Sequence, residues 1–177
     1  MKRFANFYPY IITILVICCI FLNVFCFYTI SPVTSIILVR HADRAGSADS
    51  LNTLGNVRAL ELDRVLHEAG ITAIYASNYN RTQDTADDLA SSLGISLEIY
   101  NASEIPALVT DINANHKGEV ILVVGHSNTV PETIGLLGIS PQPLDIDHDE
   151  YDHMYHVTLS DHTVPRLIKM KYGAVTD

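Results

Sequence analysis

Side chains that could bind and attack a phosphate group occur at three places in the sequence. Arg40 and His41 directly follow one apolar, β-branched run, and His126 directly follows another. Arg81 comes four residues after a third such run. An arginine guanidinium carries a permanent charge and a planar set of donors that matches phosphate oxygens. An imidazole nitrogen can attack a phosphoryl group, so one histidine could serve as nucleophile while the other stabilises charge on the transferring group.

Strand and helix patterns alternate along the chain from Ser35 onward, which predicts an α/β fold. Strands are expected at 35–39, 71–77, 96–100, 119–125, 156–160 and 166–172. Helices are expected at 51–70, 82–94, 103–116 and 128–138, with Asn52 or Thr53 and Ser103 as caps and Gly70 and Gly94 as stops. Ligands gather at the carboxyl ends of parallel strands, so we expect the four side chains to meet at one edge of the sheet.

Three sequence blocks resemble the signature blocks of the histidine phosphatase (phosphoglycerate mutase-like) superfamily. They are LVRHADR (38–44), IYASNYNRTQDTA (74–86) and VVGHSNT (123–129), and LNTLGNVRA (51–59) is similar to the helix-opening segment between them. The resemblance covers nearly all of residues 35–173. It implies a three-layer α/β/α sandwich with a mixed, mostly parallel sheet, and a phosphatase that needs no metal or other cofactor.

By this resemblance, His41 would be the phosphorylated nucleophile, and Arg40, Arg81 and His126 would complete the phosphate pocket. Ala42 stands where the family usually has a glycine. Only 44 residues separate Arg81 from His126, too few for the substrate-covering insertion that carries the general acid of larger members. Phosphoglycerate mutase activity is therefore not expected, and a small phosphate ester, a phosphoramidate or a phosphoprotein is the expected substrate.

The proton donor for the leaving group is left open by the sequence. Asp43 is the nearest carboxyl to His41, and Glu104 and Glu150 are more distant candidates. A leaving group that departs readily would need little help from an acid. Arg44 could add a third cation to the pocket or could face solvent. The N–H groups of residues 127 and 128 could reach a phosphate or merely cap a helix.

The stretch DIDHDEYDHMYH (145–156) mixes carboxylates with three histidines and suits a divalent metal in chemistry, although no standard ligand spacing is present. It could equally be a solvated loop at the edge of the site. A second reading of the chain is therefore a membrane-anchored, non-catalytic module that binds a phosphorylated ligand or a metal.

The first 34 residues differ in character from the rest. Residues 11–30 are almost entirely apolar, and twenty helical residues would span roughly 30 Å, the thickness of a bilayer core. Lys2 and Arg3 precede this stretch, so the positive-inside bias places the following domain outside the cytoplasm. We expect an N-terminal anchor or long signal segment over 1–34 and a single domain over 35–177, which could alternatively be exported after cleavage.

The charge of the domain excludes one class of partner. Without Lys2 and Arg3 the chain has nine basic and twenty acidic side chains, a formal charge of −11. Nucleic acid is therefore not an expected partner, because its binding needs a basic surface. All three cysteines lie within the first 34 residues, so a disulfide scaffold is excluded for the domain.

Overall fold

The structure is a computed structural model that describes residues 11–20, 31–140 and 146–176. The chain divides into two compact units, residues 1–31 and 32–177. In the first unit, residues 11–20 are helical and exposed, and the remainder of the predicted 11–30 span lies outside the described residues. No helix in the described ranges combines the length and the apolar character needed to cross a membrane.

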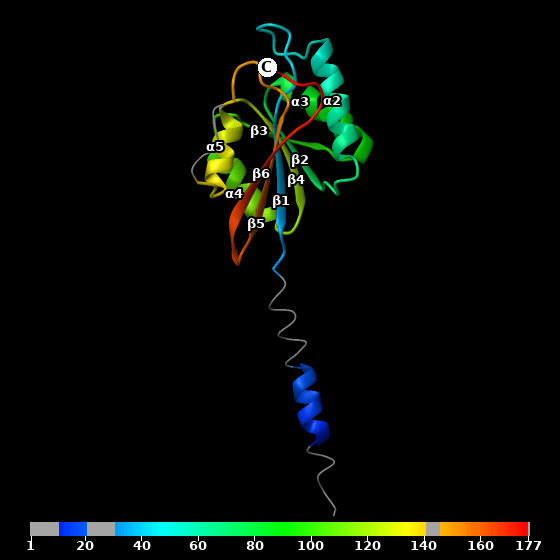
Figure 1. Ribbon diagram of the computed structural model, residues 1–177, viewed down its shortest axis with the longest axis vertical. Helices are drawn as coiled ribbons and strands as arrows, with labels where there is room; N and C mark the ends of the chain where they lie inside the picture. Colours follow the sequence, from blue (N-terminus) through cyan, green and yellow to red (C-terminus); the bar gives the residue numbers. More distant parts are fainter. Residues whose placement is uncertain (1–10, 21–30, 141–145, 177) are drawn as a thin grey trace, which may run out of the picture. The chain divides into compact units, whose positions relative to one another are not determined.

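The second unit is built around one six-stranded sheet (Figure 1). In spatial order the strands are β3 (Leu97–Tyr100), β2 (Ala73–Ser77), β4 (Val120–Gly125), β1 (Thr34–Arg40), β5 (His153–Ser160) and β6 (Thr163–Lys171). The first four run parallel, whereas β5 and β6 are antiparallel to their neighbours. The predicted mixed, mostly parallel sheet is confirmed.

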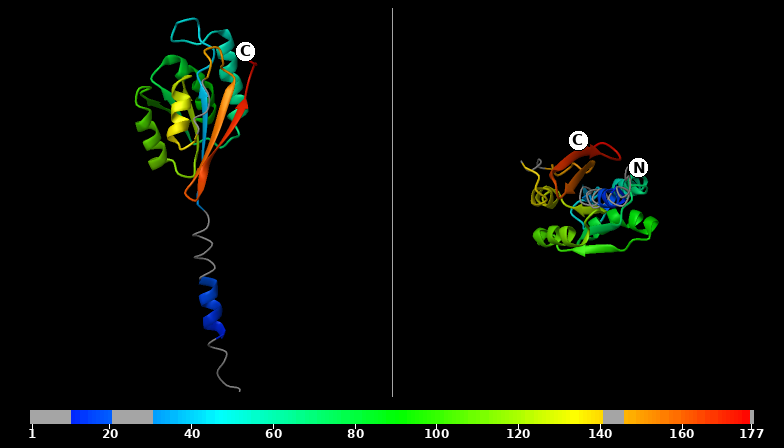
Figure 2. Two further views of the ribbon diagram at one scale, coloured as in Figure 1. Left: turned by 60° about the vertical axis from the view of Figure 1, so that its left-hand side comes forward. Right: turned by 90° about the horizontal axis from the view of Figure 1, so that it is seen from below.

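Four helices cover the two faces of this sheet, and Figure 2 shows helices on both sides of the strands. They are α2 (Thr53–Leu66), α3 (Asn80–Leu93), α4 (Ile105–Asn115) and α5 (Thr129–Leu136). Side chains alternate along β1, so Ile37 and Val39 pack with residues of α2 and α3 while Ile36 and Leu38 pack with residues of α4 and α5. The result is the expected three-layer sandwich with an apolar core on each face.

The helix ends test the predicted caps. Asn52 caps α2 by accepting a hydrogen bond from the Gly55 amide at 2.9 Å, and Gly94 ends α3 in the left-handed conformation, with φ of 68°. The prediction that Ser103 caps α4 was wrong. Glu104 holds that position without a side-chain bond, and the Ser103 hydroxyl instead lies 2.9 Å from the side-chain oxygen of Asn101.

The last two strands differ from their predicted bounds. β5 begins at His153, three residues earlier than expected, so part of the acidic stretch is strand rather than loop. β6 begins at Thr163, three residues before the expected 166, so Pro165 lies inside this strand. This strand is at the edge of the sheet, where a residue without an N–H costs no ladder hydrogen bond.

Candidate active site

The structure brings the four cationic or basic side chains to one cavity of about 650 Å³. Arg40 and His41 come from the end of β1, Arg81 from the first turn of α3, and His126 from the residue after β4. Parallel pairing sets Arg40 opposite Gly125, which places His41 beside His126. The centroids of the two imidazole rings are 5.5 Å apart. Carboxyl ends of adjacent parallel strands thus supply the centre of the site.

Arg40 is buried and firmly held on one side. Its Nη1 donates to the backbone carbonyl oxygens of Asp147, His148 and Glu150 at 2.9, 2.7 and 3.0 Å. Its Nε is buried and has no partner among the described residues, and the same is true of Nε in Arg44 and Arg81. Arg40, Arg44 and Arg81 all line the cavity, so their guanidinium groups are placed to donate to an anion there.

Arg81 is held differently, by an ion pair. Its Nη1 lies 2.7 Å from the carboxylate of Asp49, and its guanidinium lies 4.4 Å from the ring centroid of Tyr79. Asp49 also accepts hydrogen bonds from the backbone amides of Asn80 and Arg81 at the start of α3. The remaining amino group, Nη2, lies 3.3 Å from Nδ1 of His126.

The protonation of His41 follows from its contacts. Nδ1 lies 2.8 Å from the carbonyl oxygen of Ala42, which can only accept, so Nδ1 carries the proton and Nε2 has a free electron pair. Burial lowers the pKa of His41 to about 3. The Ala42 hydrogen bond opposes this shift, and the charges of Arg40 and Arg81 add to it. The ring is therefore neutral at pH 7, the state that a nucleophile requires.

His126 has the opposite tautomer. Arg81 can only donate to Nδ1, so the proton is on Nε2, which lies 2.8 Å from the Ser77 hydroxyl. Ser77 in turn contacts the hydroxyl of Thr82 at 2.9 Å. Burial and the charges of Arg81 and Arg40 lower the pKa of His126 to about 4. Its Nδ1 therefore accepts from Arg81 in this state, and a proton taken up there would replace that hydrogen bond.

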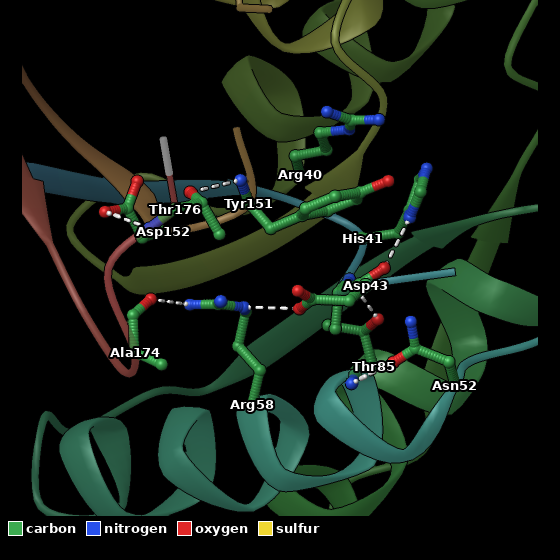
Figure 3. A network of polar contacts seen from close by, with 12 residues as sticks. Arg40, His41, Asp43, Asn52, Arg58, Thr85, Tyr151, Asp152, Ala174 and Thr176 are labelled. Carbon is green, nitrogen blue, oxygen red and sulfur yellow. Dashed lines mark hydrogen bonds and ion pairs between the residues drawn. The ribbon is translucent and has the colours of Figure 1, made fainter. Parts of the chain in front are cut away.

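Asp43 requires a correction as a proton donor. Its carboxylate is buried and pairs with Nε of Arg58 on α2 at 2.7 Å, as Figure 3 shows, and it does not line the cavity. Arg58 also donates to the carbonyl oxygens of Tyr172 and Ala174. Because this carboxylate is taken up by the Arg58 ion pair and does not line the cavity, Asp43 supports the backbone next to His41 instead of delivering a proton.

The other two carboxyl candidates are also absent from the cavity wall. No Asp or Glu is among the described residues that line it, and Glu104 borders a separate hollow beside α4. The Glu150 side chain accepts from the Asp147 amide at 3.1 Å. Arg44, by contrast, does line the cavity, where its Nη2 lies 3.0 Å from Nε2 of His148.

The acidic stretch does not form a metal site within the described residues. Among the described residues, one group has ligand atoms close enough together for a metal ion. It consists of Glu98, Asp111 and His116 and lies outside the predicted stretch. The Tyr75 hydroxyl already bridges Asp111 and His116, so hydrogen bonds within the protein satisfy that group. Residues 141–145, which include the first Asp of the stretch, lie outside the described part of the chain.

Several residues of the site were missed by the sequence analysis. Asp49, Tyr79, His148 and Tyr151 all contact one of the cationic or basic side chains. Asp49 and His148 come from loops that no hydrophobic pattern marks. Tyr79 lies two residues before Arg81, and His148 and Tyr151 lie in the 145–156 stretch that was considered as a loop at the edge of the site, but the sequence assigned none of them a contact.

Comparison with known proteins places this fold and site in a class. The sequence profile of the histidine phosphatase superfamily (branch 1) matches residues 36–104, the segment that carries Arg40, His41 and Arg81. No curated protein matches in sequence. Residues 36–104 of the chain thus match the histidine phosphatase superfamily, the family that its sequence blocks were predicted to resemble.

Solved structures share the fold at low sequence identity. The protein histidine phosphatase SixA complexed with tungstate is 18% identical, with a TM-score of 0.64 over 77% of this chain and 96% of that one. A mycobacterial glucosyl-3-phosphoglycerate phosphatase is 14% identical, with a TM-score of 0.60 over 76% and 97%. Phosphoglycerate mutase from Plasmodium falciparum is 18% identical, with a TM-score of 0.56 over 82% and 94%.

Proposed function

We propose that the protein is a phosphatase that hydrolyses phosphate monoesters or phosphoramidates through a phosphohistidine on His41. The observation that carries the proposal is the free Nε2 electron pair of a neutral His41 in a cavity that Arg40, Arg81 and His126 also line. The superfamily profile that matches residues 36–104 and the phosphatases among the similar folds support it.

In the first step, Nε2 of His41 attacks phosphorus, forming an N–P bond as the bond to the leaving group breaks. Negative charge in this transition state lies on the equatorial oxygens, where Arg40 and Arg81 supply fixed donors. His126 takes up a proton from solvent as the dianion binds and becomes a further donor, and it returns that proton to solvent when inorganic phosphate leaves. The leaving group departs with the electron pair of the broken bond and receives a proton from solvent.

In the second step, water attacks the phosphohistidine and the N–P bond breaks, which returns the electron pair to Nε2. The water proton passes to solvent, and inorganic phosphate leaves. The hydrogen bond from Nδ1 to the Ala42 carbonyl holds the ring in the same tautomer throughout, so the nucleophile is regenerated ready for another cycle.

The cavity favours substrates with a good leaving group. Because no described lining residue is a carboxylic acid, the site lacks the usual donor for a poor alkoxide leaving group. Phosphoramidates and acyl phosphates need less protonation at the transition state. The fold similarity to SixA, described as a protein histidine phosphatase, is consistent with a phosphohistidine on another protein as substrate.

The test compares the wild-type chain with His41→Ala. We expect wild-type protein to release phosphate from an aryl phosphate and to take up acid-labile phosphate label, and His41→Ala to lose at least 10³-fold in kcat/KM and all of the label. His67→Ala, at the exposed C-cap of α2, is the matched control and should keep full activity. Wild-type protein that binds tungstate but takes no label would instead be a non-catalytic binding module.

We further propose that residues 11–30 attach the protein to a membrane with the phosphatase domain outside the cytoplasm. The apolar run and the preceding Lys2 and Arg3 support this, and the described helix over 11–20 belongs to that run. The full chain should sediment with lipid vesicles, and Leu15→Arg combined with Val16→Arg should leave it in the supernatant. Equal sedimentation of both proteins would contradict attachment through this segment.

A further inference from the structure

Residues 147–151, in the described part of the loop before β5, lie along one edge of the Arg40 guanidinium. Three of their backbone carbonyl oxygens, from residues 147, 148 and 150, accept from the single Nη1 atom. That atom has two hydrogens, so this loop saturates it. Nε is buried and has no protein partner in the described chain, which leaves Nη2 as the amino group for a ligand. The loop therefore selects which donors of Arg40 face the cavity.

The ring of Tyr151 supports the same guanidinium from its flat side. Arg40 Cζ lies 4.1 Å from the ring centroid, within the range of a cation–π contact, and the ring is buried. The Tyr151 centroid is also 5.8 Å from that of His41. Figure 3 shows the Tyr151 ring extending from the backbone beside Arg40 toward His41. One aromatic ring thus touches both residues that end β1.

Tyr151 is itself fixed by the end of the chain. Its backbone N–H donates to the Thr176 hydroxyl at 3.0 Å, and the neighbouring Asp152 carboxylate accepts from the Thr176 amide at 3.3 Å, as Figure 3 illustrates. Asp152 also pairs with Lys171 at 2.9 Å. Residues near the C-terminus therefore hold the loop that holds Arg40.

We propose that Tyr151 is a positioning residue for Arg40, and that the acidic, histidine-containing loop serves to orient this arginine toward the bound phosphoryl group. Carbonyl dipoles and an aromatic face fix a guanidinium without neutralising it, so its full charge reaches the ligand. The stretch that suggested a metal site in the sequence thus works mainly through its backbone and one ring. The inference rests on the proposed function for its substrate, but anion binding tests it without turnover.

The experiment measures tungstate affinity by calorimetry, and KM and kcat for an aryl phosphate, in Tyr151→Leu and Tyr151→Phe. Tyr151→Leu removes the aromatic face and should weaken tungstate binding about three- to tenfold and raise KM by a similar factor, with a smaller change in kcat. Tyr151→Phe keeps the face and should stay within about twofold of wild type. An equal loss in both variants would overturn the proposal.

A double-mutant cycle shows whether the effect passes through Arg40. In an Arg40→Ala background, Tyr151→Leu should change tungstate affinity by less than about twofold. The same loss with and without Arg40 would mean that Tyr151 acts only on general packing, and would overturn the proposal.

A second variant covers the case in which Tyr151→Leu does not fold. Thr176→Ala removes the acceptor of the Tyr151 N–H and should weaken tungstate binding about twofold. Unchanged affinity in Thr176→Ala would then decide against the proposal. Wild-type protein that binds tungstate but hydrolyses nothing would refute the proposed function alone, because the affinity comparison would still stand.

Discussion

The regions around Arg40 and Arg81 place a guanidinium in the same cavity by different means. Arg40 is gripped by neutral groups, three backbone carbonyls and the ring of Tyr151. Arg81 is gripped by a carboxylate, that of Asp49, at 2.7 Å. The first arrangement fixes position and leaves the charge intact, whereas the second fixes position and cancels part of the charge.

The two arginines therefore have different roles in binding the ligand. Arg40 is positioned to supply most of the field that attracts a dianion. Arg81 has its second amino group beside His126, so it supplies direction to that ring as well as charge. Hydrogen bonds from the amides of Asn80 and Arg81 and from the Arg81 side chain outweigh burial and lower the pKa of Asp49, so the pair stays ionised.

The largest effect is expected from removing each arginine. Arg40→Ala should lower kcat/KM for an aryl phosphate by about 10³-fold, because a fully charged donor to the equatorial oxygens is lost. Arg81→Ala, made together with Asp49→Asn so that no unpaired carboxylate remains, should lower it by about 10²-fold. Steady-state kinetics give the loss in kcat/KM for each variant, and thermal melting checks that each protein is folded. A larger loss in the Arg81 variant than in Arg40→Ala would contradict these roles.

Much of this site was predictable because its centre depends on strand pairing. An apolar run that ends in Arg40-His41 and another that ends before His126 must bring these residues together once β1 and β4 pair in parallel. The contacts of Asp49 and Tyr151 could not be predicted, since each comes from a loop whose path depends on the whole fold. Asp43 was misassigned because nearness in sequence to His41 does not show that its carboxylate turns toward Arg58.

A pH effect on stability is the next in size. Burial and the arginines hold the pKa of His41 to about 3 and that of His126 to about 4, both below the ordinary value of about 6.5. As the pH falls below 6.5, His41 and His126 bind protons in the unfolded chain but stay neutral in the folded chain. The free energy of unfolding should therefore fall between about pH 6.5 and 4, by up to about 1.4 kcal/mol per pH unit for each histidine. Urea titrations across this range measure it.

The same histidines refine the comparison between the arginines. After burial, the charge of Arg40 depresses the pKa of His41 more than that of Arg81 does, and the order is reversed for His126. In an NMR titration, Arg40→Ala should therefore raise the pKa of His41 more than Arg81→Ala does, and the reverse should hold for the pKa of His126. A His41→Asn, His126→Asn double variant should lose the added slope of stability with pH, and an unchanged slope would assign it to other groups.

The smallest effect, at Asp49, has a sign that depends on what replaces the carboxylate. Asp49→Asn keeps an oxygen for the amides of Asn80 and Arg81 but removes the negative charge, so tungstate should bind about two- to fivefold more tightly. Asp49→Ala removes the charge and the acceptor together, so Arg81 loses its fixed orientation and binding should be no tighter than in wild type. Calorimetry at low and high salt separates the two, because the gain in Asp49→Asn is electrostatic and should shrink at high ionic strength. If both variants bind more tightly by the same factor, Asp49 only reduces the charge of Arg81 and does not orient it.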